Sequence, residues 1–215
     1  MNAVLGQAVE SLDSPQLLVD LDVVDANLAA LRNACEQRGV SLRAHFKSLK
    51  CTGLAHYLHE RGVDSFLCAK LNEAEALIES GLTDVLIANQ VVGRTKLRRL
   101  MELCQRGRVS VCVDDPGNVR ALSEAAVAAD TTVGVLVEVN IGMNRCGVEP
   151  GRPTLELSQL VRSLPGLYFV GLAAANSFGP LLRFAFGARF AAERLSAHLT
   201  RTAARRPALR EPAPA

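Results

Sequence analysis

The residues of this chain best suited to chemistry lie in one short basic segment. Its pattern predicts a strand over residues 40–46 that runs into a helix, so that the side chains of Arg43, His45 and Lys47 share one face. Three basic groups on one face are costly to bury without an anion to meet them. A lysine at the end of such a strand can form a Schiff base with an aldehyde whose phosphate lies nearby. The alternative is a basic face that only lines a solvated edge.

Polar side chains also follow the next four expected strands. They are Lys70, Asn89, Gln90, Asp114, Glu138 and Asn140, with Arg145 in the loop after the fifth strand. Parallel α/β folds place their sites at the carboxyl ends of strands, so this set predicts an active face. Lys47 and Arg145 suit anions, the carboxylates orient or offset them, and the amides suit neutral hydrogen bonds. Asp114 is expected to cap a helix, and Lys70 to be a solvated loop lysine.

The elements that position these residues repeat regularly. Apolar strands are expected at residues 40–46, 65–69, 84–89, 109–113, 133–139 and 167–172, and a helix separates each from the next. This alternation predicts an α/β fold with a parallel sheet and helices outside. An open doubly wound sheet and a (β/α)8 barrel both fit, and the short, even units favour the barrel. A full barrel takes about 250 residues, so an incomplete barrel of about six units is expected.

Before these units the sequence predicts one more strand and one more helix. The strand is expected at residues 16–21, and Asp22 is expected to cap the helix that follows. A buried stripe is expected on that helix at Val24, Leu28, Leu31 and Cys35.

The composition changes near residue 173. The whole chain of 215 residues carries a net charge of +2, which favours neither nucleic acid nor a membrane as partner. Residues 173–215, however, are rich in Ala, Arg and Pro and carry seven Arg against two Glu. We therefore expect a partial barrel domain over residues 1–172 and a divergent tail over residues 173–215, whose last residues have a disordered composition.

The cysteines and the N-terminus indicate a cytoplasmic protein. The six cysteines are scattered, without a C-x-x-C pair or zinc-ligand spacing, and several occupy apolar positions. This pattern favours a reducing compartment. No signal peptide is expected, and no apolar run reaches the roughly 18 residues that span a bilayer.

Several ordered blocks resemble the D-threonine aldolase and D-serine dehydratase group of pyridoxal-phosphate enzymes, which have the alanine-racemase-like fold. The segment R-A-H-F-K-S-L-K at residues 43–50 resembles the group's R-P-H-x-K-T-H-K signature. Further similar blocks follow in the same order at residues 68–74, 86–93 and 137–147, so that the likeness covers residues 14–172. These blocks are specific for the superfamily, and they separate lyases from racemases less securely.

The resemblance implies particular roles for four residues. Lys47 would hold pyridoxal 5'-phosphate as a Schiff base and act in catalysis, and Arg145 would contact the cofactor's phenolic oxygen or the substrate carboxylate. His45 and Gln90 would lie near the cofactor. The implied enzyme is a lyase that cleaves or dehydrates D-3-hydroxy amino acids. The resemblance also allows a homodimer.

The sequence also departs from the group. Ala44 replaces the signature's proline, Leu49 replaces its second histidine, and the likeness stops after Leu172. The family's C-terminal β domain, which carries a divalent-metal site, has no counterpart, so no metal site is expected here. Two alternatives to a lyase stay open: a non-catalytic pyridoxal-phosphate-binding protein of the homeostasis type, and an inactive truncated isoform.

Overall fold

The computed structural model describes residues 8–13, 15, 17–142 and 144–174. The chain divides into two units, Met1–Arg43 and Ala44–Ala215. The first contains the short 3-10 helix η1 (Val9–Ser11) and the helix α1 (Leu21–Glu36). The second contains the sheet and the candidate residues His45, Lys47, Gln90 and Arg145. The proposed tail lies almost wholly outside the described residues, and the boundary at residue 172 stays a prediction.

The N-terminal unit corrects three expectations. Among the described residues Leu17–Asp20 form no strand, and the Leu17 side chain is almost fully exposed. The cap of α1 is Asp20 rather than Asp22, because the Asp20 carboxylate accepts hydrogen bonds from the backbone N–H groups of Asp22 and Val23. Leu28 is buried as expected, whereas Leu31 is half exposed.

The second unit is built on a parallel sheet of six strands that lie in chain order. The strands are β1 (Ala44–His45), β2 (Phe66–Cys68), β3 (Asp84–Ile87), β4 (Arg108–Val113), β5 (Val133–Val139) and β6 (Leu167–Ala174). The helices are α2 (Phe46–Leu49), α3 (Thr52–His59), α4 (Leu71–Glu79), α5 (Arg94–Cys104), α6 (Pro116–Ala128) and α7 (Arg152–Ser163). The expected alternation of strands and helices is confirmed, although β1 is much shorter than expected and β6 ends two residues later.

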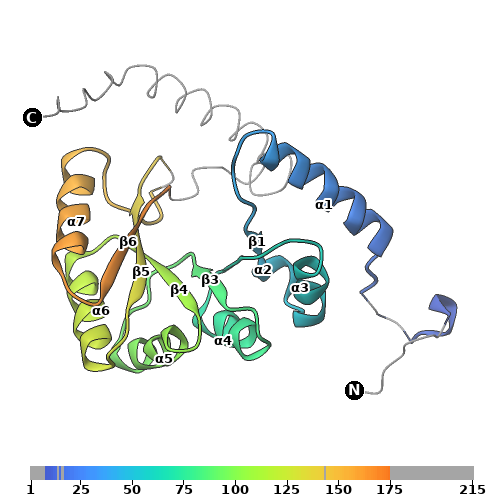
Figure 1. The fold of residues 1–215 in the computed structure, drawn as a ribbon, viewed down its shortest axis with the longest axis horizontal. Coiled ribbons are helices and arrows are strands. Elements are labelled where there is room, and N and C mark those ends of the chain that lie inside the picture. Colours follow the sequence, from blue (N-terminus) through green and yellow to red (C-terminus); the bar gives the residue numbers. More distant parts are fainter. Residues whose placement is uncertain (1–7, 14, 16, 143, 175–215) are drawn as a thin grey trace, which may run out of the picture. The chain divides into compact units, whose positions relative to one another are not determined.

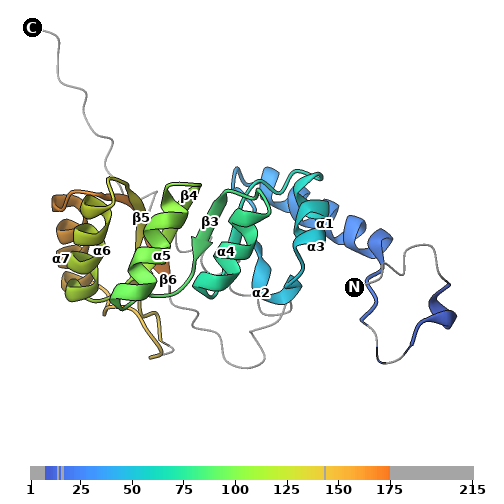
Figure 2. The ribbon, with the colours of Figure 1, turned by 90° about the horizontal axis from the view of Figure 1, so that it is seen from below.

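The strand order decides between the two architectures that the sequence left open. A doubly wound sheet reverses its order at a switch point and carries helices on both faces. Here successive strands are always neighbours, and Figures 1 and 2 show α4, α5, α6 and α7 following one another over one face of the sheet. The architecture is that of the (β/α) barrel. Side-chain contacts join adjacent helices, among them the two hydrogen bonds from Arg99 on α5 to Glu75 on α4.

The two faces of the sheet differ in their side chains. Val109, Val111 and Val113 on β4 are fully buried, as are Val133, Val135 and Val137 on β5, and they form the core beneath the helices. The alternate residues face the concave side, which a barrel encloses. Gly134 lies on that side, and an added Cβ there would come within 2.7 Å of the Tyr168 hydroxyl oxygen. The concave face therefore packs closely at its amino end, around Gly134 and Tyr168.

Candidate active site

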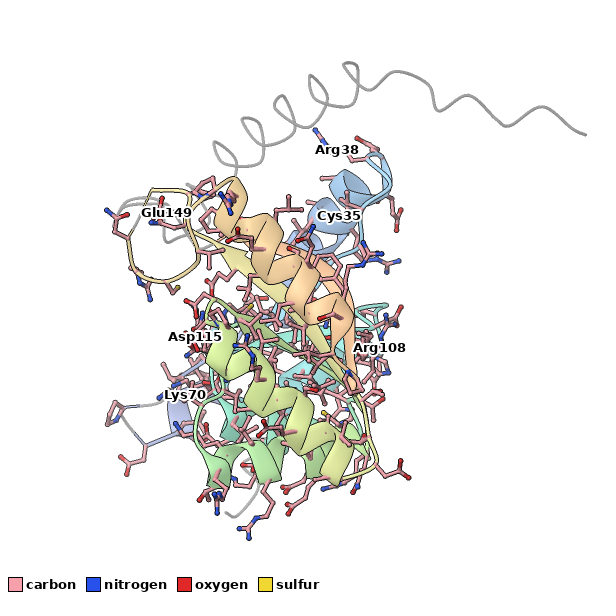
Figure 3. The ribbon with its side chains drawn as sticks, turned by 90° about the vertical axis from the view of Figure 1, so that its left-hand side faces the viewer. Cys35, Arg38, Lys70, Arg108, Asp115 and Glu149 are labelled. Carbon is pink, nitrogen blue, oxygen red and sulfur yellow. The ribbon has the colours of Figure 1, made fainter. Side chains whose placement is uncertain are left out.

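The carboxyl ends of the strands bring the candidate residues to one edge of the sheet. Figure 3 labels Lys70, Asp115 and Glu149, which follow β2, β4 and β5, and shows them on the side opposite Arg108, the first residue of β4. The loops at this edge carry the polar groups singled out in the sequence. In parallel α/β proteins this is the edge where ligands bind.

Lys47 lies in the first turn of α2, not at the end of a strand. The expected strand over residues 40–46 is wrong in its extent, because β1 contains only Ala44 and His45. The His45 imidazole caps the short helix, and its Nδ1 accepts a hydrogen bond from the Lys47 backbone N–H at 3.3 Å. The Lys47 side chain is exposed, and within the described part of the chain no hydrogen bond or ion pair occupies its Nζ.

His45 is partly buried beside this lysine and pairs in register with Leu67 of β2. Burial lowers its pKa below 6.5, and the positive charge of Lys47 lowers the pKa further. A hydrogen bond with the backbone of Leu67 and the negative charge of Glu73 act in the opposite direction. The lowered pKa keeps the imidazole neutral at neutral pH, as its role as a hydrogen-bond acceptor requires.

Gln90 is joined to the end of β5 by a short hydrogen bond. Its Nε2 donates to Oε2 of Glu138 at 2.6 Å, across the 48 residues that separate them in sequence. The other carboxylate oxygen, Oε1, accepts from the Cys146 thiol at 3.1 Å. Burial, followed by the hydrogen bond and the charge of Glu138, raises the pKa of Cys146 to about 11, so this thiol stays protonated and donates.

The loop between β5 and α7 that carries Arg145, called the Arg145 loop below, folds back onto the end of β5. Val148 pairs with Val139 as an isolated bridge, and its N–H donates to the Glu138 carbonyl at 2.9 Å. The buried Asn140 side chain accepts from the backbone N–H groups of Gly142 and Asn144. Arg145 itself is exposed, and its charge lowers the pKa of the neighbouring Cys146 against the larger opposing effects.

The capping role expected of Asp114 belongs to the next residue, Asp115. The cap of α6 is Asp115, whose carboxylate accepts from the Asn118 N–H at 2.8 Å. Asp114 instead accepts from the Gly147 N–H at 2.8 Å and so fixes the Arg145 loop from the neighbouring strand. The expectation that Asp114 caps the helix is wrong, because the cap position falls one residue later. Lys70 is exposed, as expected of a loop lysine.

A cavity of about 450 Å³ opens at this edge between the first turns of α4 and α5. Its lining includes Lys70, Asn72, Asn89, Gln90 and Lys96. Gln90 therefore faces a space that could admit a small polar ligand, while its amide remains attached to Glu138.

Two contributors at this edge were not singled out in the sequence. Glu73 is buried in the first turn of α4, and its carboxylate accepts from the Ala69 N–H at 2.8 Å. A glutamate at the third helical position is a known capping signal and could have identified it. Cys146 was read only as one scattered cysteine, and no local pattern indicates that it meets Glu138.

The four candidate residues form two groups rather than one cluster. His45 contacts Lys47 through the backbone, and Gln90 and the Arg145 loop meet at Glu138. Among the described residues no hydrogen bond or ion pair joins Lys47 to Gln90 or Arg145. Within the same part of the chain, no group of three or more His, Cys, Asp or Glu side chains is placed to hold a metal ion. None of the described helices is long and apolar enough to cross a membrane.

Comparison with known proteins adds a family and several relatives. The family model described as alanine racemase, N-terminal domain, matches residues 19–202. The chain is 38% identical over 169 residues to a D-threonine aldolase of Arthrobacter sp., covering 79% of this chain and 45% of that protein. It is 33% identical over 174 residues to a 3-hydroxy-D-aspartate aldolase of Paracoccus denitrificans, covering 80% and 45%. The chain thus spans about half the length of the curated relatives it matches.

Solved structures agree with this likeness. The crystal structure of a D-threonine aldolase from Filomicrobium marinum is 48% identical and superposes with a TM-score of 0.73, covering 74% of this chain and 43% of that one. A D-threo-3-hydroxyaspartate dehydratase from Delftia sp. HT23 is 25% identical, with a TM-score of 0.69 over 76% of this chain and 44% of that one.

Proposed function

Because the chain belongs to the alanine racemase N-terminal domain family, we propose that it binds pyridoxal 5'-phosphate through Lys47 and acts as a lyase on D-3-hydroxy amino acids. The proposal draws on the relatives, which include a D-threonine aldolase and a D-threo-3-hydroxyaspartate dehydratase. It also draws on the likeness of residues 43–50 to the signature of pyridoxal-phosphate enzymes of this fold.

One structural observation carries the proposal. The amine of Lys47 is exposed at the carboxyl edge of β1, with no hydrogen-bond or ion-pair partner among the described residues. An amine that is to condense with an aldehyde must be accessible and free of competing partners. The other candidate residues at this edge of the sheet also fit such a ligand, because Arg145 supplies a cation for anionic oxygens and Gln90 an amide for neutral groups.

When bound, the cofactor supplies a conjugated ring that accepts the electrons released by a bond broken at the α-carbon. The chain's own residues do the rest. Lys47 Nζ would hold the cofactor covalently, and as a free amine it would hold or release a proton near the α-carbon of the substrate. Neutral His45 keeps the first turn of α2 in place through its Nδ1, and Arg145 orients an anionic group.

The experiment that tests this proposal is covalent trapping. Pyridoxal phosphate is added to the whole chain, the mixture is reduced with borohydride, and the modified peptide is mapped by mass spectrometry. We expect the label on Lys47 and its loss in Lys47→Arg, which keeps the charge and cannot form the bond. Lys70→Arg is the matched control, since Lys70 is an exposed lysine that follows the next strand.

Turnover then separates the lyase from its alternatives. We expect the chain loaded with the cofactor to release glycine and acetaldehyde from D-threonine, or to deaminate a D-3-hydroxy amino acid, in the presence of a divalent metal. Labelling at Lys47 without either reaction would indicate the non-catalytic cofactor-binding protein instead. A label spread over several exposed lysines, unchanged in Lys47→Arg, would overturn the proposal.

A further inference from the structure

Glu138 is the most constrained acidic side chain at the carboxyl edge of the sheet. It is only 9% exposed, and each of its carboxylate oxygens accepts one hydrogen bond, from Gln90 and from Cys146. Its backbone carbonyl accepts a third, from Val148. A single residue of β5 is therefore joined to the segment after β3 and to two residues of the loop that follow Arg145.

The hydrogen bond to Glu138 also decides which way the Gln90 amide points. A carboxylate only accepts hydrogen bonds, so the amide must turn its NH2 group toward Glu138. The carbonyl Oε1 of Gln90 is then left as an acceptor, and no hydrogen bond to it is present among the described residues. The contact is polar, short and nearly buried, which makes the alternative orientation of the amide unfavourable.

Cys146 links the Glu138 carboxylate to the Arg145 loop through a hydrogen bond. Its thiol stays protonated because the pKa is raised to about 11, and it donates to Glu138 from the residue next to Arg145. The Gly147 N–H that follows is bound to Asp114. Arg145 thus stands beside a loop segment attached to two neighbouring strands.

We propose that Glu138 is a positioning residue of the site, which fixes the Gln90 amide with its carbonyl toward a hydrogen-bond donor of the bound ligand and anchors the Arg145 loop through Cys146. This inference rests on the proposed function, because the ligand is pyridoxal phosphate or the D-amino acid that reacts with it. The donor is an N–H or O–H group of one of these two molecules. No contact between Glu138 and the ligand is required.

The test uses variants of the whole chain that separate the two roles. Glu138→Gln keeps the size of the side chain, but its single amide oxygen can accept from Cys146 or from Gln90 and not from both. Where it accepts from Cys146, the loop stays protected and the NH2 group faces Gln90, so that the Gln90 amide must turn over. Cys146→Ala releases the loop and leaves the Gln90–Glu138 contact in place. Glu124→Gln, an exposed glutamate on α6, is the matched control.

Three measurements are made on each variant: the melting temperature, the hydrogen exchange of the peptide over residues 140–148 without ligand, and the dissociation constants for pyridoxal phosphate and then for D-threonine. Glu138→Gln is expected to keep its melting temperature and loop protection and to raise one of the two dissociation constants roughly fivefold or more, as the loss of one hydrogen bond predicts. Cys146→Ala is expected to speed exchange in the loop. Glu124→Gln should match the unmodified chain.

The possible failures can be told apart. If the unmodified chain is labelled at Lys47 and Glu138→Gln, with its loop still protected, binds both molecules as tightly as the unmodified chain, only the positioning role is overturned. If loop exchange in Cys146→Ala is unchanged, the anchoring role is overturned, whether or not a ligand binds. If Glu138→Gln does not fold, Gln90→Leu, which removes the acceptor and leaves the carboxylate in place, must weaken the same dissociation constant, or the proposal is wrong. If the unmodified chain takes up no cofactor, the proposed function fails as well.

Discussion

His45 illustrates how one side chain can serve structure and site together. Its Nδ1 caps α2, and its pKa lies below 6.5 because of burial and the charge of Lys47. The unfolded chain therefore binds a proton at His45 at a higher pH than the folded chain does. The contribution of this group to stability is complete above about pH 6.5 and is lost as the pH falls through the lowered pKa.

A pH titration of stability checks this prediction. The free energy of unfolding, measured by urea denaturation, should fall between about pH 7 and pH 5 more steeply in the unmodified chain than in His45→Asn. Asparagine does not titrate and is a good helix cap, so the variant should lose little stability at pH 7. Equal slopes for the two proteins would show that His45 does not titrate differently on folding.

Single residues also show where sequence reasoning succeeds and where it fails. The sequence located an aspartate cap at the start of α1 and of α6 but chose the wrong one of two nearby aspartates in both cases, because either residue satisfies the pattern and only the backbone decides. The Glu138–Gln90 pair could not be foreseen at all, since its partners are 48 residues apart and meet only after the sheet has formed.

At the scale of elements, the sequence was most informative where a buried face repeats. The expected strand at residues 133–139 coincides with β5, in which the alternate valines Val133, Val135 and Val137 are fully buried. Only two residues of the strand expected at residues 40–46 form a strand in the structure. The pattern of basic residues does not indicate where the strand ends and the helix begins. The packing of the Arg145 loop onto β5 could not be predicted in this way, because the loop sequence has no periodic pattern of apolar residues.

The Arg145 loop depends on a glycine in a restricted backbone conformation. Gly147 has a φ of +95°, and an added Cβ would lie 2.6 Å from the Asn140 backbone nitrogen. Gly147→Ala therefore combines backbone strain with a clash against main chain, and we expect it to cost more than the roughly 1–3 kcal/mol of a strained backbone alone. It should also speed hydrogen exchange over residues 140–148.

Gly142 in the same loop is the matched control for this prediction. Its φ is also positive, at +122°, but an added Cβ would meet nothing within 4 Å. Gly142→Ala should therefore show the strain without the clash and lower the melting temperature less than Gly147→Ala does. Equal losses in the two variants would contradict the steric explanation.

At the scale of the molecule, the strand order explains why the candidate residues are spread so widely in sequence. His45 ends β1, Lys47 follows it, Gln90 follows β3 and Arg145 follows β5, yet parallel strands in chain order bring all of them to one edge. A ligand held by these residues would bind only the folded sheet. Binding should then stabilise the sheet as a unit.

If pyridoxal phosphate binds at this edge, the melting temperature of the chain should rise with the concentration of pyridoxal phosphate. At a free concentration of about 100 times the dissociation constant, binding adds about 2.7 kcal/mol to the free energy of unfolding. For a chain of this length that corresponds to a rise in melting temperature of roughly 5–10 °C.

Lys47→Arg should show a much smaller rise. An analogue with an alcohol in place of the aldehyde should also have little effect, because it cannot form the covalent bond. A shift of equal size for the aldehyde and the alcohol would mean that the molecule binds without Lys47, and a shift absent altogether would mean that the sheet edge does not hold it.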